Sequence, residues 1–325
     1  MARRPLQRVQ AALVARRFYL QKQSKSQIAD ELGISRFKVA RLLETAIEEG
    51  VIEFVIHDEA DLDAELAEAL RRKYKLKAAL VLDGPDLPSS ALIEPLGILG
   101  ADLLKEVLSD GQSLGVAWGR TLAATARNLT WLPKVDVVQA AGSPAGLDFS
   151  QSPVDLVHRF ASVSGGRAFP LFGPMWAEAP KLIQGLREEP SIASVLSRYD
   201  TLNVLVIGIG SWNPAESCLC SGFPPTWRDI ALANGVCADL CATLIDKSGR
   251  AVPNMLDELG LSITTAQLRR IPQVIGIGGG LEKAEAILAA LRGGWLSILV
   301  TDGGVARRLM TDNGVRSPRP KHVPK

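Results

Sequence analysis

The sequence has little that points to a membrane or to secretion. None of its 325 residues fall in an uninterrupted apolar run of about 18, the length that a membrane-spanning helix needs. The basic start, MARRPLQRVQ, is not followed by the apolar core and cleavage site of a secretory signal. We therefore expect a cytoplasmic protein without a membrane partner. Aromatic residues make up only 5% of the chain, and the dominance of Ala, Gly, Leu and Val favours an α/β fold.

Cysteine is also scarce. The chain has four cysteines, at positions Cys218, Cys220, Cys237 and Cys241. Their C-x-C and C-x3-C spacing does not match the common zinc patterns, and a core of this size needs no disulfides. We expect inert thiols in a reducing cytosol and no metal or other cofactor, although a metal site remains the alternative.

Acidic residues are rare at the start of the chain. Residues 1–43 contain ten Lys or Arg and two acids, so the remainder is slightly acidic. A basic segment on a near-neutral body predicts a polyanionic partner for that segment alone. The alternative is an ordinary solvated helix face.

Three helices are predicted in this basic segment. The first covers 8–22, with Val9, Ala12 and Leu13 near one face. A second follows Ser24, an N-cap that forms a capping box with Gln27. The third, RFKVARLLETAIEEG, runs to Gly50. Its apolar positions form one stripe at helical spacing.

The relation between the second and third helices indicates a helix-turn-helix. Ala29 lies four residues before Gly33, and Val39 lies six after it. Helices that cross at a short turn need a small residue at the crossing, a glycine in the turn and an apolar residue beyond it. The remaining core positions are filled by Ile28, Leu32, Ile34 and Leu42.

The third helix is the predicted recognition helix in double-stranded operator DNA. We expect its outward side chains to be Ser35, Arg36, Phe37, Lys38 and Arg41. Arg36 and Lys38 can reach base edges. Phosphate contacts are expected from Arg16, Arg17, Lys25 and Arg41.

The rest of the chain suggests two further parts. VIEFVI (51–56) alternates as a short strand that closes a helix-turn-helix domain over residues 1–56. The amphipathic segment 57–76 indicates a linker helix, and residues 77–325 form a third part. In that part, short apolar strands recur, most followed by a glycine turn and a helix: AALVLDG, SLGVAWG, VDVVQAAGSP, LNVLVIGIG, QVIGIGGG and WLSILVTDGG. This pattern predicts a mainly parallel sheet covered by helices on both faces.

Nucleotide cofactor motifs are incomplete in this part. Gly208-x-Gly210 is followed by Asn213 where a third glycine is required, and Gly276-x-Gly278 by Leu281. A phosphate-binding P-loop motif does not occur either. The sequence therefore favours neither a dinucleotide nor a nucleoside triphosphate.

Several glycine loops could hold a small anion instead. Gly119, Arg120 and Thr121 directly precede a predicted helix, whose N-terminal N–H groups attract anions. Gly142-Ser143 and Gly210-Ser211 form similar loops. Lys283 lies near the start of a helix after three glycines, an unfavourable place for a cation unless an anion binds there.

These residues resemble the SorC-type family (sorbitol-operon regulators) of DeoR-like bacterial transcription regulators. The similar segments are KSQIADELGISRFKVARLLETAIEEGVIEFVI, GVAWGRTL, VVQAAGSP, VIGIGS, GVCADLCATLIDKSG and GGGLEKAEAILAALRGGWLSILVTD. The resemblance implies a Rossmann-like parallel-sheet domain over 77–325, related to sugar-phosphate isomerases, that binds a sugar, sugar alcohol or sugar phosphate. It also implies homo-oligomers, as dimers or tetramers. Its effector-contacting residues would be Gly119, Arg120, Thr121, Gly142, Ser143, Gly210, Ser211, Asp239 and Lys283.

Two alternatives to an effector-controlled, non-enzymatic regulator of a carbohydrate operon remain at this point. One is a sugar-phosphate isomerase or deaminase in which Asp239, Asp246, Asp302 and Lys283 provide acid–base chemistry. The other is a structural DNA-binding protein whose large domain only oligomerises. The polar glycine loops are unnecessary for a mere scaffold, and the DNA-binding segment disfavours a purely metabolic role.

Overall fold

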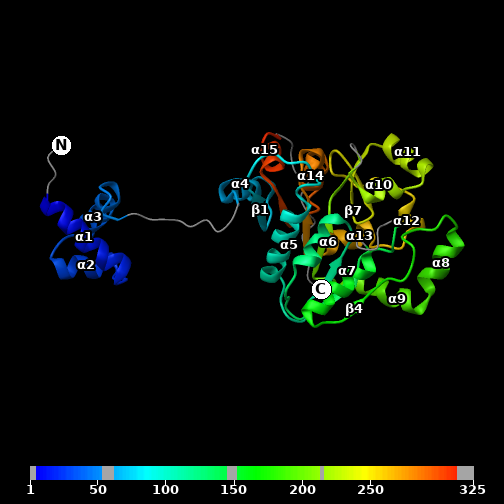
Figure 1. Ribbon diagram of the computed structural model, residues 1–325, viewed down its shortest axis with the longest axis horizontal. Coiled ribbons are helices and arrows are strands. Elements are labelled where there is room, and N and C mark those ends of the chain that lie inside the picture. The colour runs from blue at the N-terminus through cyan, green and yellow to red at the C-terminus, as the bar shows by residue number, and fades with distance from the viewer. Residues whose placement is uncertain (1–4, 53–61, 145–151, 213–215, 313–325) are drawn as a thin grey trace. The chain divides into compact units, whose positions relative to one another are not determined.

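The computed structural model describes residues 5–52, 62–144, 152–212 and 216–312 of the chain. They belong to two compact units, within residues 1–59 and 60–325 (Figure 1). Each unit has its own hydrophobic core. The two units are therefore described separately.

The first unit is helical. Its elements are α1 (Pro5–Ala15), a π-helix (Arg16–Leu20), α2 (Lys25–Leu32) and α3 (Arg36–Glu48). The predicted starts of α2 and α3 are confirmed. Ser24 and Gln27 form the capping box of α2, and the Ser35 side chain caps α3. Gly33 ends α2 in the left-handed conformation at φ 61°, which glycine adopts without strain.

The core of the first unit confirms the crossing of α2 and α3. Its buried residues are Ala11, Val14, Ala15, Ile28, Ala29, Val39, Leu42, Leu43 and Ala46, with Leu32 and Ile34 packed against them. The face predicted for the first helix was wrong, because Val9 and Leu13 are 67% and 42% exposed. The smaller side chains of Ala11 and Ala15 face inward instead, where α1 packs against α3.

The segment predicted as a strand (51–56) begins as a turn after α3 and not as a strand. The N–H groups of Val51 and Ile52 both donate to the Ala46 carbonyl oxygen, at 2.8 and 3.0 Å, and so close the end of α3. Residues 53–56 lie outside the described residues.

Within 57–76, where a linker helix was predicted, the structure has helix α4 (Ala64–Tyr74). This helix packs against the second unit's β1 (Ala78–Leu82).

The second unit is built on a seven-stranded sheet in the order β1-β10-β9-β5-β2-β3-β4, and every pair in it is parallel. The other strands are β2 (Ser113–Val116), β3 (Asp136–Gln139), β4 (Ala168–Phe169), β5 (Val204–Gly208), β9 (Gln273–Ile277) and β10 (Ile298–Asp302). All six predicted strand segments lie in this sheet, and the α/β fold class is confirmed. The two-residue strand β4 was not predicted.

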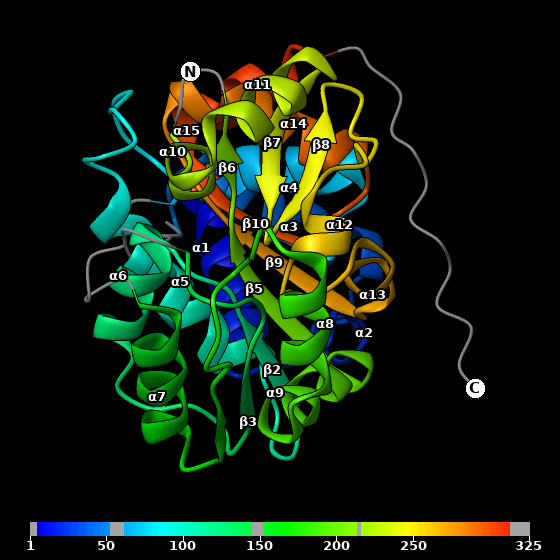
Figure 2. The same cartoon turned by 90° about the vertical axis from the view of Figure 1, so that its right-hand side faces the viewer.

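A smaller antiparallel sheet was also missed. It has the order β6-β7-β8, from β6 (Gly210–Ser211), β7 (Val236–Leu240) and β8 (Thr243–Asp246). The segment from Gly235 to Gly249, which the sequence suggested as a ligand loop, therefore forms a hairpin. Figure 2 shows β7 and β8 beside the large sheet.

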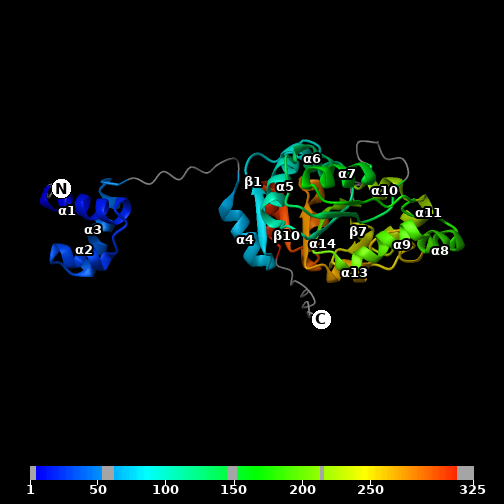
Figure 3. The same cartoon turned by 90° about the horizontal axis from the view of Figure 1, so that it is seen from below.

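Helices cover both faces of the large sheet. One face carries α5 (Ile93–Val107), α6 (Arg120–Asn128) and α7 (Pro153–Ser164), whereas α4, α14 (Ala284–Arg292) and α15 (Gly303–Met310) lie on the other (Figure 3). The remaining helices are α8 (Pro180–Glu188), α9 (Pro190–Leu196), α10 (Cys218–Gly222), α11 (Pro225–Ala233), α12 (Leu256–Leu259) and α13 (Thr265–Arg270), with short 3-10 helices at Ser197–Thr201 and Leu281–Lys283. The carboxyl ends of the adjacent strands β2, β5 and β9 meet at one edge, where such sheets bind ligands.

Candidate functional site

A pocket lies beyond the carboxyl ends of β2, β5 and β9. Its polar lining comes from loops that are far apart in the sequence, together with apolar side chains such as Trp118 and Leu96. The polar and charged members are Ser89, Arg120, Thr121, Glu216, Ser217, Cys218, Asp239, Cys241 and Lys283. A pocket beyond the carboxyl ends of parallel strands, in which polar groups from several loops converge, is a typical place for a small-molecule site.

One wall of the pocket is the N-terminus of α6. Gly119 is the N-cap at φ 126°, a conformation that favours glycine, and no side chain caps this helix. Gly119, Arg120 and Thr121 all line the pocket. The first N–H groups of α6 are therefore placed to receive an anion.

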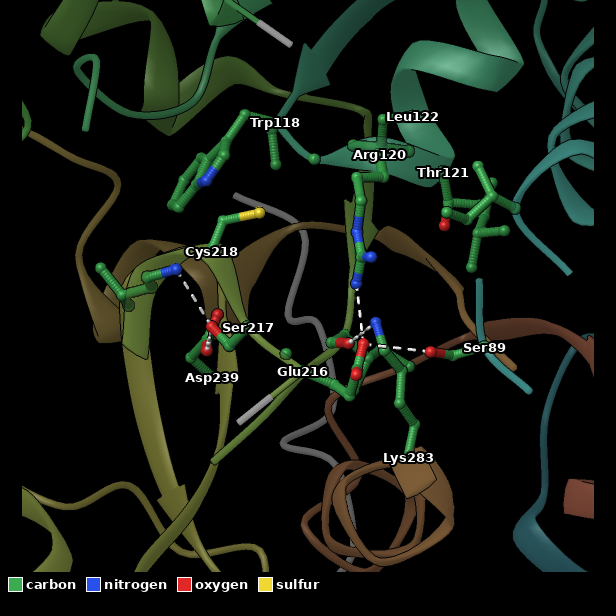
Figure 4. Close-up of a pocket in the computed structure, with 18 of the residues that line it drawn as sticks. Ser89, Trp118, Arg120, Thr121, Leu122, Glu216, Ser217, Cys218, Asp239 and Lys283 are labelled. Carbon is green, nitrogen blue, oxygen red and sulfur yellow. Dashed lines mark hydrogen bonds and ion pairs between the residues drawn. The ribbon is translucent and has the colours of Figure 1, made fainter. Parts of the chain in front are cut away.

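An ion pair crosses the pocket. Arg120 Nη2 donates to Glu216 Oε2 at 2.8 Å, and the Ser89 hydroxyl donates to the same oxygen at 3.0 Å (Figure 4). The hydrogen bond from Arg120 lowers the pKa of the Glu216 carboxyl, so Glu216 is an anion at neutral pH. The two side chains are 39% and 30% exposed, which leaves the pair within reach of a ligand.

Lys283 adds a second cation on the opposite side. Its Nζ donates to the Ile209 carbonyl oxygen at 3.1 Å, and the side chain points toward Glu216. Burial, and then the neighbouring Arg120 charge, lower the pKa of Lys283. An anion placed between Arg120 and Lys283 would relieve this repulsion.

Asp239 is the most deeply buried charged group in the pocket. It is 6% exposed, and its Oδ1 accepts from Trp212 Nε1 at 2.8 Å and from the Ser217 hydroxyl. Burial raises the pKa of this carboxyl, against the effect of those two donors. The donors fix its orientation from β7 into the pocket.

Glycines make room for these groups. A Cβ on Gly210 would lie 2.2 Å from Asp239 Oδ1, and a Cβ on Gly280 would lie 2.7 Å from the Ser89 backbone. Gly280 also has a φ of 92°. These two glycines allow Asp239 and Ser89 to approach the pocket.

The structure brings most of the predicted effector residues together. Gly119, Arg120, Thr121, Gly210, Asp239 and Lys283 all line the pocket. Gly142 and Ser143 are not among the lining residues, because their N–H groups donate to Leu261 and Gly173 carbonyl oxygens. Ser211 lies just outside the lining, and its buried hydroxyl has no hydrogen-bond partner within the described residues.

Sequence reasoning missed Ser89, Glu216, Ser217 and Cys218. Glu216 and Ser217 follow the Gly210-Ser211 loop closely, but nothing in their spacing distinguishes them from surface residues.

The four cysteines lie in or near the pocket wall and the core. Cys218 and Cys241 line the pocket, and Cys220 and Cys237 are buried. Burial raises the pKa of Cys237 to about 11. Within the described residues, no group of three or more His, Cys, Asp or Glu could share a metal.

The predicted DNA-contacting residues of the first unit are mostly on its surface. Those exposed to solvent are Arg16, Lys25, Ser35, Arg36, Phe37, Lys38 and Arg41. Phe37 is 82% exposed, which is unusual for an aromatic side chain. All but two of these residues lie at or after the N-cap of α3, where a recognition helix would meet base edges.

Arg17 is placed differently. Its Nη1 forms an ion pair with Glu31 at 2.5 Å, and Gln23 Nε2 donates to the same carboxylate at 3.0 Å. These bonds join the π-helix to α2. Lys25 has its Nζ 5.8 Å from the centre of the Phe18 ring.

The described residues contain no helix long and apolar enough to cross a membrane. Residues 58–311 match the sequence family described as "Putative sugar-binding domain". The sorbitol operon regulator of Klebsiella pneumoniae is 30% identical over 302 residues, which is 91% of this chain and 96% of that protein. The deoxyribonucleoside regulator of Bacillus subtilis is 27% identical and covers 92% of this chain and 96% of its own length.

Solved structures give the same result. The crystal structure of the full-length sorbitol operon regulator from Klebsiella pneumoniae aligns with a TM-score of 0.71 at 28% identity. The alignment covers 93% of this chain and 98% of that one. A probable sor operon regulator from Shigella flexneri aligns with a TM-score of 0.70 at 27% identity, over 76% of this chain and 98% of that chain.

Proposed function

The chain belongs to the family of sugar-binding transcriptional regulators that its sequence resembles, and we propose that its pocket binds a sugar, sugar alcohol or sugar phosphate that controls operator binding. The single observation that carries this proposal is the convergence of Arg120, Lys283 and the uncapped N-terminus of α6 on one pocket. Hydroxyl groups of a ligand can bond to Asp239, and an anionic group to the cations.

The first unit supplies the DNA contacts in this proposal. Arg36 and Lys38 read base edges in the major groove, and Arg16, Lys25 and Arg41 bind phosphates. Two recognition helices are needed to read two half-sites, so we propose that the chain works as a homo-oligomer, a dimer or tetramer. A cytoplasmic location follows from the position of operator DNA in bacteria.

We propose a sensor rather than an enzyme. Asp302 Oδ1 caps α15 through the Val305 N–H at 3.1 Å, and its Oδ2 accepts from the Gly280 N–H at 2.8 Å. Asp246 is bonded to Ser248 and Arg250 at the end of its hairpin. Asp246 and Asp302, the two carboxylates that the sequence suggested for acid–base chemistry beside Asp239, are thus committed to holding the backbone in place.

A thermal-shift screen against sugars, sugar alcohols and their phosphates tests the proposal. A ligand at a hundred times its dissociation constant adds roughly 2.7 kcal/mol to the free energy of unfolding. We expect compounds of one class in the panel to raise the melting temperature of the wild-type protein. Lys283→Ala and Thr121→Ala should reduce that shift. Lys134→Ala, an exposed lysine of the same unit, is the control. A shift that is the same in all variants would contradict the assignment of the pocket.

A further inference from the structure

Glu216 occupies the place where an anionic ligand would bind. We propose that its carboxylate is a built-in competitor, which fills the anion subsite without effector and is displaced by the phosphate of a phosphorylated effector. This inference rests on the proposed function and adds to it a residue that sets the selectivity and threshold of the pocket.

Two donors of the pocket bond the Glu216 carboxylate, and a third charged group faces it. Arg120 donates to Oε2 at 2.8 Å and Ser89 donates to it at 3.0 Å. Lys283 approaches from the other side (Figure 4), and its charge further lowers the pKa of the Glu216 carboxyl. A guanidinium and a hydroxyl on one oxygen, with an ammonium on the other side of the carboxylate, form the kind of donor set that proteins use for phosphate.

The pocket needs an anion whether or not an effector is present. Burial first, and then repulsion by the Arg120 charge, lower the pKa of Lys283. Two partly buried cations without a counter-ion are costly. Glu216 supplies that counter-ion from within the chain.

A carboxylate satisfies the subsite only in part. No side chain caps α6, so Glu216 leaves its first N–H groups without a side-chain acceptor. A phosphate has more acceptor oxygens and can bond the cations and the α6 N–H groups together. It therefore has the means to displace Glu216, whereas an unphosphorylated sugar does not.

Displacement would move a connected segment. Ser217, the next residue, caps α10 through the N–H groups of Leu219 and Cys220, and its hydroxyl also donates to Asp239. Release of Glu216 therefore changes the start of α10 and the environment of Asp239 at the same time. This couples occupation of the anion subsite to the backbone around the small sheet.

Calorimetric titration of the full chain with inorganic phosphate tests this proposal. We expect Glu216→Gln to bind phosphate about tenfold more tightly than wild type or better, because no charge-assisted hydrogen bond must be broken first. Adding Arg120→Ala to Glu216→Gln should abolish the gain. Glu94→Gln is the matched control, because Glu94 pairs with Arg127 at 2.7 Å on the surface outside the pocket. Glu216→Ala serves if the glutamine variant does not fold.

Equal or weaker phosphate binding by Glu216→Gln would overturn the proposal, because Glu216 would then support ligand binding or only the fold. Absence of phosphate binding in both proteins would overturn it as well. The proposed function would still stand in either case if unphosphorylated sugars or sugar alcohols raise the melting temperature through Lys283 and Thr121. The two failures are therefore distinguishable.

Discussion

In the first unit, the side chains assigned to DNA recognition project into solvent, whereas the charged side chains of the second unit's pocket are held by partners. Arg36 and Lys38 are exposed at the start of α3. Arg120 is bound to Glu216, and Asp239 to Trp212 and Ser217. A long polyanion can meet exposed cations directly. A small ligand instead has to compete with bonds that the pocket already makes.

The two units also differ in the size of their cores. Among the described residues, the first unit buries nine apolar residues, most of them small, and the core of the second unit extends through its sheet. A loss of the same side-chain volume should therefore be far more serious in the first unit.

The largest effect is expected from a matched pair of core substitutions. Ile28 and Ile287 are both 0% exposed, one in each unit, and each isoleucine-to-alanine change costs about 2–5 kcal/mol. We expect Ile28→Ala to unfold the first unit and abolish DNA binding, while ligand-induced thermal shifts persist. Ile287→Ala should lower the melting temperature of the second unit without unfolding it. Calorimetry and limited proteolysis would show both, and retained DNA binding by Ile28→Ala would contradict the comparison.

A second test removes the exposed cations. Replacement of both Arg36 and Lys38 by Ala should weaken operator binding about 100-fold or more, at about 1–3 kcal/mol for each good base contact. The melting temperature should not change, because both side chains are exposed. Arg72→Ala, an exposed arginine of the second unit, is the control in a fluorescence-anisotropy titration. A large fall in stability would mean that these residues hold the fold instead.

A third test measures how anion binding in the pocket depends on pH. Only protonated Lys283 attracts an anion, and its pKa is lowered by burial and Arg120. Sulfate affinity should therefore fall as the pH rises through this lowered pKa, below the range in which an exposed lysine titrates. Lys283→Arg keeps its charge at all accessible pH values, so its profile should be flat. Parallel profiles for the two proteins would contradict the role of Lys283.

The smallest effect is expected at Asp239. Burial raises the pKa of this carboxyl in the folded chain. The folded state therefore holds its proton more tightly, and the contribution of Asp239 to stability is lost as the pH rises through the folded pKa. Asp239→Asn should thus gain stability relative to wild type as the pH rises from about 4, where an unfolded aspartate titrates, through the raised folded pKa. Asp136→Asn should lose stability relative to wild type as the pH rises through the acidic range below about 4, because the hydrogen bond from Arg167 lowers the pKa of Asp136 in the folded chain. Denaturant unfolding at several pH values would measure both.

The sequence predicted local features well. The capping box of Ser24 and Gln27, the turn at Gly33 and six of the seven strands of the large sheet could be predicted, because their signals lie within a few residues of one another. The inward face of α1 was wrong because the contact with α3 decides which side chains are buried: Val14 is buried, whereas Val9, of the same size, is exposed. Glu216 and Ser89 could not be predicted, because they meet only when segments more than a hundred residues apart are folded together.

At Gly142 and Ser143, tertiary contacts made a sequence-based prediction wrong. Their sequence resembles the other glycine loops, but their N–H groups are bonded to the backbone of distant segments. Whether a glycine loop offers N–H groups to a ligand depends on those tertiary bonds, which the local sequence does not encode.

The central claim is that occupation of the pocket changes the affinity of the first unit for DNA. The direct measurement is the operator affinity of the full chain at a fixed salt concentration, in wild type and in Lys283→Ala. It is made with and without the sugar, sugar alcohol or sugar phosphate that raises the melting temperature. We predict a change of about fivefold or more in wild type, the scale of typical coupling between sites, and a much smaller one in the variant. An identical operator affinity with and without bound ligand would contradict the claim.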